Sequence, residues 1–260
     1  MLRTLTATRY VTPLREGGSL PAIVEADDDG LYVLKFRGAG QGPKSLIAEL
    51  VAGEIGRALG LRVPELVFME LDSAFGRNEP DAEIQALLKA SVGLNIALDF
   101  LPGALPFDPL LRPKPDPVLA SAIVWFDAYV MNVDRTPRNS NMLLWHKNLW
   151  LIDQAAALYF HHAWAGYLER SRSPFVSIKN HVLLPFASAL TQVAAELKPR
   201  LTPTLLQGIT DTIPDDWLGD DPFFASHTEH RAAYLTFLLD RLEASDIFVE
   251  EASNAHAHAV

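Results

Sequence analysis

The hydrophobic pattern near the start of the chain predicts short β-strands. Apolar stretches at 10–11, 22–25 and 31–36 alternate with turn-forming residues at 17–19 and 28–30, an order typical of antiparallel strands joined by tight turns. Further strands are expected at 62–64, 66–71 and 94–99. The first part of the chain is therefore expected to form a small antiparallel sheet.

Helical periodicity interrupts these strands at 45–59. Apolar residues recur there at the spacing of one helix face, namely Leu46, Leu50, Val51, Ile55, Ala58 and Leu59. Ser45 is placed to cap this helix, and Gly60 follows it. Two glutamates lie on it, Glu49 near the edge of the apolar stripe and Glu54 nearer its middle. Amphipathic helices are also expected at 183–197 and 231–242.

A second apolar stretch, at 118–131, predicts a buried helix that begins with Asp116 as its N-cap and Pro117 as its first residue. A polar loop follows. Strands are then expected at 141–145 and 149–153, joined by a connection of hairpin length. Because a hairpin returns the chain to its starting point, residues just before the first strand and at the end of the second should converge.

Proline divides the chain between these two parts. Residues 102–117 contain six prolines, which disfavour regular helix or sheet through most of this segment. We therefore expect a first lobe at 1–101, an irregular connection at 102–117, a second lobe at 118–251 and a disordered tail at 252–260.

Composition excludes several classes of protein. The 260 residues carry a formal net charge of -10 without a sustained basic run, which argues against a nucleic-acid surface. The chain has no cysteine, which excludes disulfides and thiolate metal sites. The N-terminus has no apolar signal core, and the apolar stretch at 118–131 is too short to cross a bilayer. A cytoplasmic protein without a membrane span is expected.

Oxygen-bearing side chains suited to phosphate chemistry lie around the predicted hairpin. Asp134 and Asn139 lie in the loop before it, five positions apart, and Asp153 lies at its far end. Hard oxygen ligands of this kind suit Mg²⁺, which also takes phosphate oxygens. The three residues together indicate phosphoryl transfer, a reaction that depends mostly on positioning and charge neutralisation.

Lys35 extends this pattern into the predicted sheet, because it lies in the apolar strand 31–36, where a buried ammonium needs an anionic partner. Phosphate and a glutamate are the candidates. The helical wheel favours Glu54 as that glutamate, whereas order along the chain favours Glu49. The turn formed by Gly17, Gly18 and Ser19 is suited to cover a nucleotide. Backbone groups of Asp99, Phe100 and Leu101 are candidates for binding adenine.

These residues resemble the HipA-like kinase family of the protein-kinase-like superfamily, with a catalytic loop similar to that of phosphatidylinositol kinases. The resemblance rests on Asn132-x-Asp134 followed by Asn139, on Lys35 in the third strand, on Glu49 ten residues before Leu59-Gly60-Leu61, and on Asp153. It implies an α+β, bilobal protein-kinase-like fold with a small antiparallel-sheet N-terminal lobe and a larger, mainly helical C-terminal lobe.

The resemblance also implies roles. ATP and Mg²⁺ would bind in the cleft, Asn139 and Asp153 would hold the metal, Lys35 would hold phosphates while Glu49 keeps it in place, and Asp134 would orient or deprotonate a protein serine or threonine hydroxyl. Two departures bear on these roles. Thr136 stands where HipA proteins commonly have histidine. After Asp153, Gln154-Ala155 replaces the Phe-Gly that follows the metal-binding aspartate of typical protein kinases.

Two alternative functions stay open on the sequence. The first is a kinase for a small molecule, either a sugar or alcohol or a lipid head group, and the second is a catalytically inactive nucleotide-binding module. Basic residues in 156–190 form either a solvated face or a surface for an acidic acceptor, namely His161, His162, Arg170, Arg172, Lys179 and His181. The unknown acceptor and ATP are therefore the expected partners.

Overall fold

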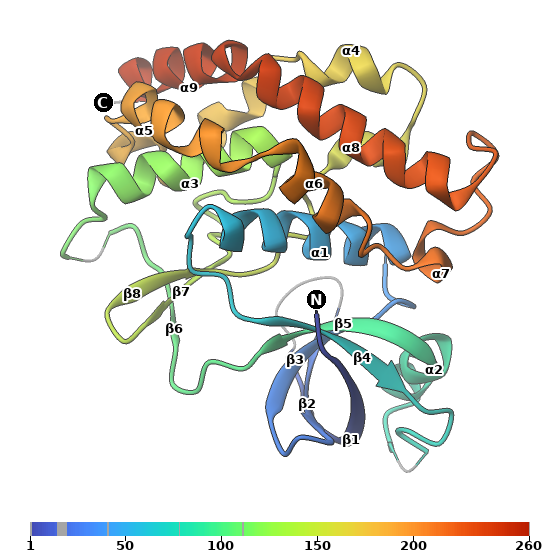
Figure 1. The fold of residues 1–260 in the computed structure, drawn as a ribbon. Coiled ribbons are helices and arrows are strands. Elements are labelled where there is room, and N and C mark those ends of the chain that lie inside the picture. Colours follow the sequence, from blue (N-terminus) through green and yellow to red (C-terminus); the bar gives the residue numbers. More distant parts are fainter. Residues whose placement is uncertain (1, 15–19, 41, 78, 111, 260) are drawn as a thin grey trace.

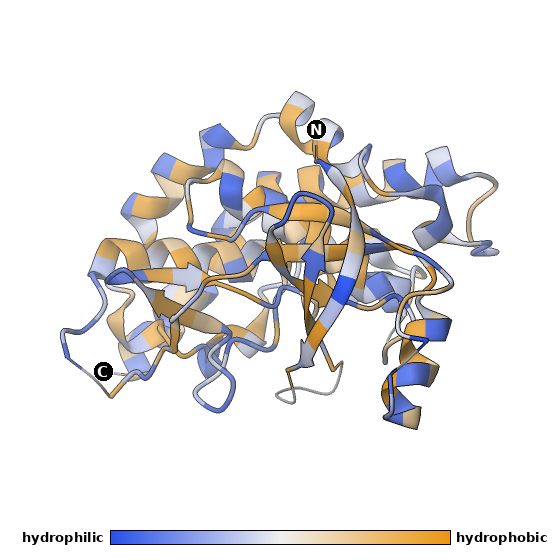
Figure 2. Ribbon diagram, turned by 90° about the horizontal axis from the view of Figure 1, so that it is seen from below, coloured by the Kyte–Doolittle hydropathy of each residue, from blue (hydrophilic) through white to orange (hydrophobic). Residues whose placement is uncertain are grey.

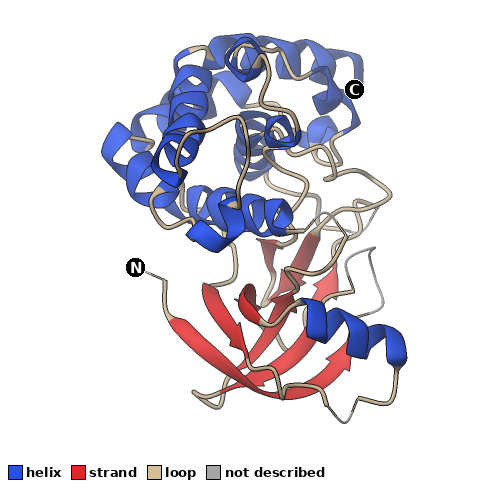
Figure 3. Ribbon diagram, turned by 90° about the vertical axis from the view of Figure 1, so that its right-hand side faces the viewer, coloured by secondary structure: helices blue, strands red, loops and turns tan. Residues whose placement is uncertain are grey.

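The computed structural model describes residues 2–14, 20–40, 42–77, 79–110 and 112–259. The strands gather at one end of the molecule and most helices at the other, with α1 between the first five strands and helices α3, α6 and α8 (Figures 1 and 3). The strands are β1 (Thr4–Pro13), β2 (Ala22–Ala26), β3 (Leu31–Lys35), β4 (Leu66–Leu71), β5 (Gly93–Asp99), β6 (Leu105–Pro106), β7 (Met142–Trp145) and β8 (Asn148–Leu151). The α-helices are α1 (Pro43–Ala58), α2 (Ala82–Ala90), α3 (Pro117–Val130), α4 (Tyr167–Ser171), α5 (Leu190–Leu197), α6 (Pro203–Thr210), α7 (Asp215–Leu218), α8 (His227–Glu243) and α9 (Ser245–Ala259).

The first five strands form a closed barrel in the order β1-β2-β3-β5-β4. The prediction of a purely antiparallel sheet is wrong in one respect, because β1 pairs parallel to β4, with Leu5 opposite Met69. The reason lies in residues 4–8, where Leu5 and Ala7 are buried and the three threonines between and beside them are exposed. This alternation makes 4–8 a strand as well, and the longer β1 reaches β4 and closes the sheet.

Helix α1 connects the barrel to the helical part of the molecule. Its N-cap is Gly42, not Ser45, whose hydroxyl instead donates to the carbonyl of Gly42. One continuous hydrophobic core includes Leu50 of α1, Ile96 of β5 and Trp125 of α3. Hydrophobic residues accordingly run through the central strands and helices when the molecule is seen from the barrel side (Figure 2). The position of α1 is therefore fixed from both sides.

Helix α3 begins as the sequence predicts, because the carboxylate of Asp116 accepts a hydrogen bond from the backbone N–H of Leu119. The end of the helix is buried, so its last carbonyls need partners inside the protein. Arg241 of α8 supplies them: its guanidinium donates to the carbonyls of Ala128 and Tyr129 and, on its other side, to that of Ser171. This one side chain therefore ties α8 to the end of α3.

The predicted hairpin is present as β7 and β8, which pair antiparallel around a two-residue turn at His146 and Lys147. Both turn residues have positive φ, 47° and 63°, as the tightest hairpin turns require. The proline-rich connection also contributes to this sheet, because β6 pairs with β7. Proline is tolerated in β6 because this strand lies at the edge of the small sheet.

Several segments differ from their predictions. Residues 62–64 form no strand, and the helix expected at 183–197 begins only at Leu190, as α5. The expected disordered tail is helical to Ala259 as part of α9, because Phe248 and Ala252 are buried against the helical core. The segment 211–228, expected to be a surface connection, contains α7, whose Trp217 is buried and donates from its indole N–H to the carbonyl of Leu94 in β5. No helix within the described ranges combines the length and hydropathy of a membrane span.

Replacing Arg241 tests the importance of the contacts at the end of α3. Arg241→Met keeps most of the side-chain volume but leaves buried carbonyls of Ala128 and Tyr129 without donors, and we expect it to lower the free energy of unfolding by about 3 kcal/mol. Arg172→Met is the matched control, since Arg172 only forms an exposed pair with Glu243, and its loss should cost about 0.5 kcal/mol or less. Urea unfolding followed by circular dichroism measures both; equal effects would contradict the role of Arg241.

Candidate active site

A buried ammonium group brings together residues from three distant parts of the chain. Lys35, at the end of β3, is 8% exposed. Its Nζ lies 2.6 Å from Oδ1 of Asp153, just after β8, and 3.5 Å from Oε2 of Glu49 on α1. The barrel, α1 and the hairpin therefore meet at one charged cluster.

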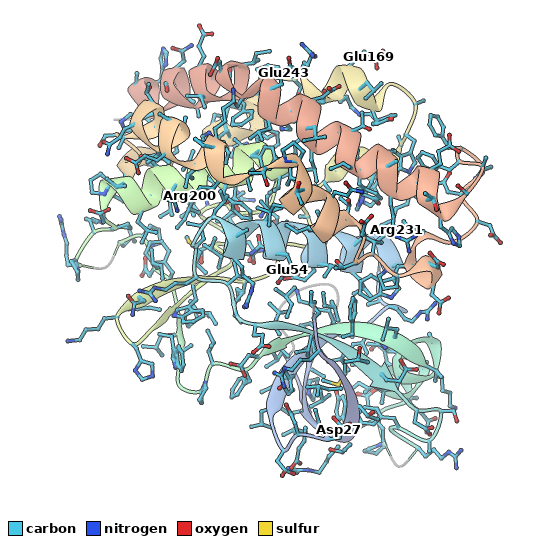
Figure 4. The ribbon with its side chains drawn as sticks, in the orientation of Figure 1. Asp27, Glu54, Glu169, Arg200, Arg231 and Glu243 are labelled. Carbon is cyan, nitrogen blue, oxygen red and sulfur yellow. The ribbon has the colours of Figure 1, made fainter. Side chains whose placement is uncertain are left out.

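Of the two candidate glutamates, Glu49 is the one beside Lys35. It is fully buried, and its Oε2 also accepts a hydrogen bond from the backbone N–H of Gln154. Glu54, labelled in Figure 4, instead pairs with Arg57 on the same helix. Order along the chain was thus the better guide, because the core surrounds more of α1 than a one-sided stripe would suggest.

The pKa values of the three ionisable groups in this cluster are shifted in different directions. Burial raises the pKa of Glu49 above its usual value, and the attraction of Lys35 only partly opposes this. The pKa of Lys35 is raised in spite of its burial, because Glu49 and Asp153 both favour the charged ammonium. Burial also opposes ionisation of Asp153, but Lys35 overcomes it and lowers the pKa of that carboxyl. Lys35 and Asp153 are therefore both ionised at neutral pH.

The loop between α3 and β7 holds Asp134 in a fixed position. Its Oδ2 accepts hydrogen bonds from the side-chain amides of Asn139, at 2.7 Å, and Asn141, at 3.2 Å. Its backbone N–H donates to Oδ1 of Asn132 at 3.1 Å. Asp134 and Asn139, predicted as partners from their spacing, are therefore in direct contact.

Asp153 is linked to this loop through the backbone. The N–H of Ile152 donates to the carbonyl of Asn141, whose side chain contacts Asp134. Asp153 itself has a left-handed backbone conformation, with φ of 55°, and its side chain turns to Lys35. The structure thus brings Asp153 to the loop of Asp134 and Asn139, as the hairpin predicted.

The predicted adenine-binding backbone lies farther along the barrel. Lys35 pairs with Ile96 in β5, and Asp99 lies three positions beyond, opposite Tyr32, which is about 10 Å along the strand. The N–H groups of Asp99 and Phe100 already donate to the carbonyls of Glu65 and Leu31. These two amides therefore already have partners, and the carbonyls of this segment and the backbone of Leu101 remain the candidates for adenine, which stays a prediction. The predicted covering turn of Gly17, Gly18 and Ser19 lies outside the described residues.

The basic residues at 156–190 do not form one positive surface. His161 and His181 are buried, and burial lowers the pKa of both. Arg170 donates to backbone carbonyls of its own segment, and Arg172 pairs with Glu243. His161 and His181 therefore cannot contribute to a basic surface for an acidic acceptor.

Sequence reasoning missed a buried polar group beside the loop. Asp127, on the last turn of α3, is fully buried and contacts Asn132, Arg135 and His181. The signal was present, because a carboxylate inside the apolar stretch 118–131 needs partners as much as Lys35 does.

Comparison with known proteins gives a consistent result. A protein-family model described as "HipA-like kinase" matches residues 8–251. The crystal structure of the Helicobacter pylori proinflammatory kinase CtkA is similar in fold, with a TM-score of 0.58 and 14% identity over 98% of this chain and 97% of that one.

Two structures of the Golgi casein kinase are less similar. One has a TM-score of 0.46 and 12% identity over 96% of this chain and 72% of that one. The other, with Mn/ADP bound, has a TM-score of 0.46 and 11% identity over 99% of this chain and 74% of that one. No curated protein matches the sequence.

The buried histidines predict how stability depends on pH. Because the pKa of His161 is lowered on folding, the unfolded chain binds a proton that the folded chain does not, and stability declines as pH falls below about 6.5. His161→Gln should reduce the slope of unfolding free energy against pH, between about pH 6 and 5, by up to about 1.4 kcal/mol per pH unit. Urea titrations across this range measure it, and an unchanged slope would show that His161 is not the titrating group.

Proposed function

The chain belongs to the HipA-like kinase family, and from this premise we propose that it transfers the γ-phosphoryl group of ATP to a serine or threonine hydroxyl of a protein. The single observation that carries the proposal is the contact of Lys35 with both Asp153 and Glu49. This contact supports the proposal, because Lys35 would bind phosphates directly beside Asp153, which would bind a metal ion.

In this reaction the bond from the γ-phosphorus to the bridging oxygen of ADP breaks, and a bond to the acceptor oxygen forms. The acceptor proton passes to Asp134. Because the amides of Asn139 and Asn141 both donate to Oδ2 of Asp134, the other oxygen, Oδ1, is the one we assign to the acceptor hydroxyl.

Lys35 would bind nucleotide phosphate in place of Asp153. Glu49 holds the ammonium at the end of β3. Because Glu49 is fully buried, it would keep this contact when phosphate replaces Asp153. Glu49 also accepts a hydrogen bond from the backbone N–H of Gln154. One carboxylate therefore positions both Lys35 and Gln154, which follows Asp153. In our proposal the barrel with α1 and the helical part act as two lobes on either side of the nucleotide.

The donor set fits a divalent metal that binds together with nucleotide. Among the described residues no three histidine or acidic side chains form a ready-made metal site. Mg²⁺ is commonly held by only one or two protein side chains, with phosphate oxygens completing its coordination. The carboxylate of Asp153 and the amide oxygen of Asn139 supply such a pair, since Asn139 contacts Asp134 through its nitrogen. When bound, the metal would neutralise charge on the phosphates.

Incubation of the purified chain with labelled ATP and Mg²⁺ tests the function. We expect label on serine or threonine of a protein, either the chain itself or an added acceptor, and loss of transfer by about 100-fold or more in Asp134→Ala. EDTA should abolish transfer. Label only on an added sugar, alcohol or lipid head group would select the small-molecule alternative, and nucleotide binding without any transfer would indicate an inactive module.

The two glutamates of α1 provide a matched pair of variants. Glu49→Gln weakens the hold on Lys35, and we expect it to reduce kcat/KM for ATP by about 10-fold or more. Glu54→Gln changes a half-buried pair with Arg57 on the same helix, without a contact to Lys35, and should stay within about twofold of wild type. Steady-state kinetics measure both, and equal values for the two variants would remove Glu49 from the site.

A further inference from the structure

The carboxylate of Asp127 is the centre of a buried polar network behind the catalytic loop. Its Oδ2 accepts from Nε of Arg135 at 2.5 Å and from Nε2 of His181 at 2.8 Å. Its Oδ1 accepts from the side-chain amide of Asn132 at 3.1 Å. These partners all follow α3 in the chain, so one helical side chain holds segments that have no helical structure of their own at those positions.

The network is almost completely buried. Asp127 is fully buried and Arg135 is 1% exposed, and such a pair is retained only with good geometry and further hydrogen bonds. Although burial opposes its ionisation, the pKa of Asp127 is lowered by Arg135 and His181. Removing one partner would leave the other charge buried without compensation.

One branch of the network leads to Asp134. Asn132 donates from its Nδ2 to Asp127 and accepts, through its Oδ1, the backbone N–H of Asp134 at 3.1 Å. The amide of Asn132 thus connects the two aspartates directly. The backbone supports the same turn, because the N–H of Asn132 donates to the carbonyl of Asp127.

A second branch leads to Asp153. Arg135 donates from Nη2 to Oε1 of Gln154 at 2.7 Å and from Nη1 to the carbonyl of Asn141. Gln154 follows Asp153 and bonds through its N–H to Glu49. The guanidinium therefore spans both ends of the hairpin, where the proposed base and the proposed metal ligand lie.

A third branch leads to the segment after the site. The N–H of Leu183 donates to Nδ1 of His181, so the ring proton lies on Nε2 and points to Asp127. The N–H of Val182 donates to the carbonyl of Arg135. Residues 181–183 are therefore attached to the same network.

We propose that Asp127 is a positioning residue for phosphoryl transfer, which fixes Asp134 through Asn132 and the segment of Asp153 through Arg135. This inference rests on the proposed function. Asp127 touches no substrate; it sets the geometry of groups that do, and small displacements of such groups reduce the rate of the chemical step more than the binding of nucleotide.

The test compares Asp127→Asn with two other variants. Asn keeps the shape of the side chain, but its amide presents a donor where Arg135 or His181 also donates. Asn132→Ala removes the link from Asp127 to Asp134, together with a longer contact of the same amide with Gln154 at 3.5 Å, and leaves Arg135 and His181 on Asp127. This variant tests the inference if Asp127→Asn does not fold. Ser121→Ala is the matched control, because Ser121 is also fully buried on α3 and hydrogen-bonded to another segment, at Ala189, away from the loop.

We expect Asp127→Asn and Asn132→Ala to lower kcat by about 30-fold or more while KM for ATP stays within about threefold. Hydrogen exchange of the Asp134 amide, followed by NMR, should become about 10-fold faster or more in both. Ser121→Ala should leave kcat and this exchange rate within about twofold of wild type, whatever its effect on melting temperature.

Two results would overturn the inference: kcat near that of wild type in folded Asn132→Ala, or exchange of the Asp134 amide no faster than in Ser121→Ala. The proposed function fails separately, if wild-type protein transfers phosphate to no acceptor. In that case the exchange rates still decide whether Asp127 holds the loop.

Discussion

The structure depends on where the charge of Lys35 is placed. An ammonium at the end of an apolar strand is unfavourable unless carboxylates surround it, and the two that do so come from α1 and from the end of the β7–β8 hairpin. The barrel, the helix and the hairpin are thereby held in one arrangement. Because Lys35 and Asp153 are ionised side by side, the same contact that stabilises the fold also places opposite charges where phosphate and metal are expected to bind.

A second charge, on Asp127, performs the corresponding task on the helical side. The end of α3 is buried, and each of its last groups has a partner: Arg241 for the carbonyls of Ala128 and Tyr129, and Arg135 for the carboxylate of Asp127. The two clusters are joined at Gln154, which bonds to Glu49 through its backbone and to Arg135 through its side chain. A substitution in the cluster of Lys35 is thus expected to disturb the cluster of Asp127, and the reverse.

Local sequence patterns predicted the parts of the site that depend on short-range geometry. The hairpin that joins the end of β8 to Asn141 is one such part, and the ion pairs of Lys35, which follow from one charge in an apolar strand, are another. The predictions that were wrong concern packing between distant segments. The helical core buries His161 and His181, and the helix at 245–259 forms because Phe248 packs into that core. Two missed features had signals in the sequence. The alternation of apolar and polar residues at 4–8 indicates the strand that closes the barrel, and a carboxylate in an apolar helix indicates that Asp127 needs buried partners.

The most direct measurement is a crystal structure with Mg²⁺ and a non-hydrolysable ATP analogue. The metal should lie about 2.1 Å from oxygens of Asp153 and Asn139, and Nζ of Lys35 should have exchanged its contact with Asp153 for a phosphate oxygen while keeping Glu49. Nucleotide bound elsewhere on the molecule, or a metal ion that contacts neither Asp153 nor Asn139, would contradict the proposed site.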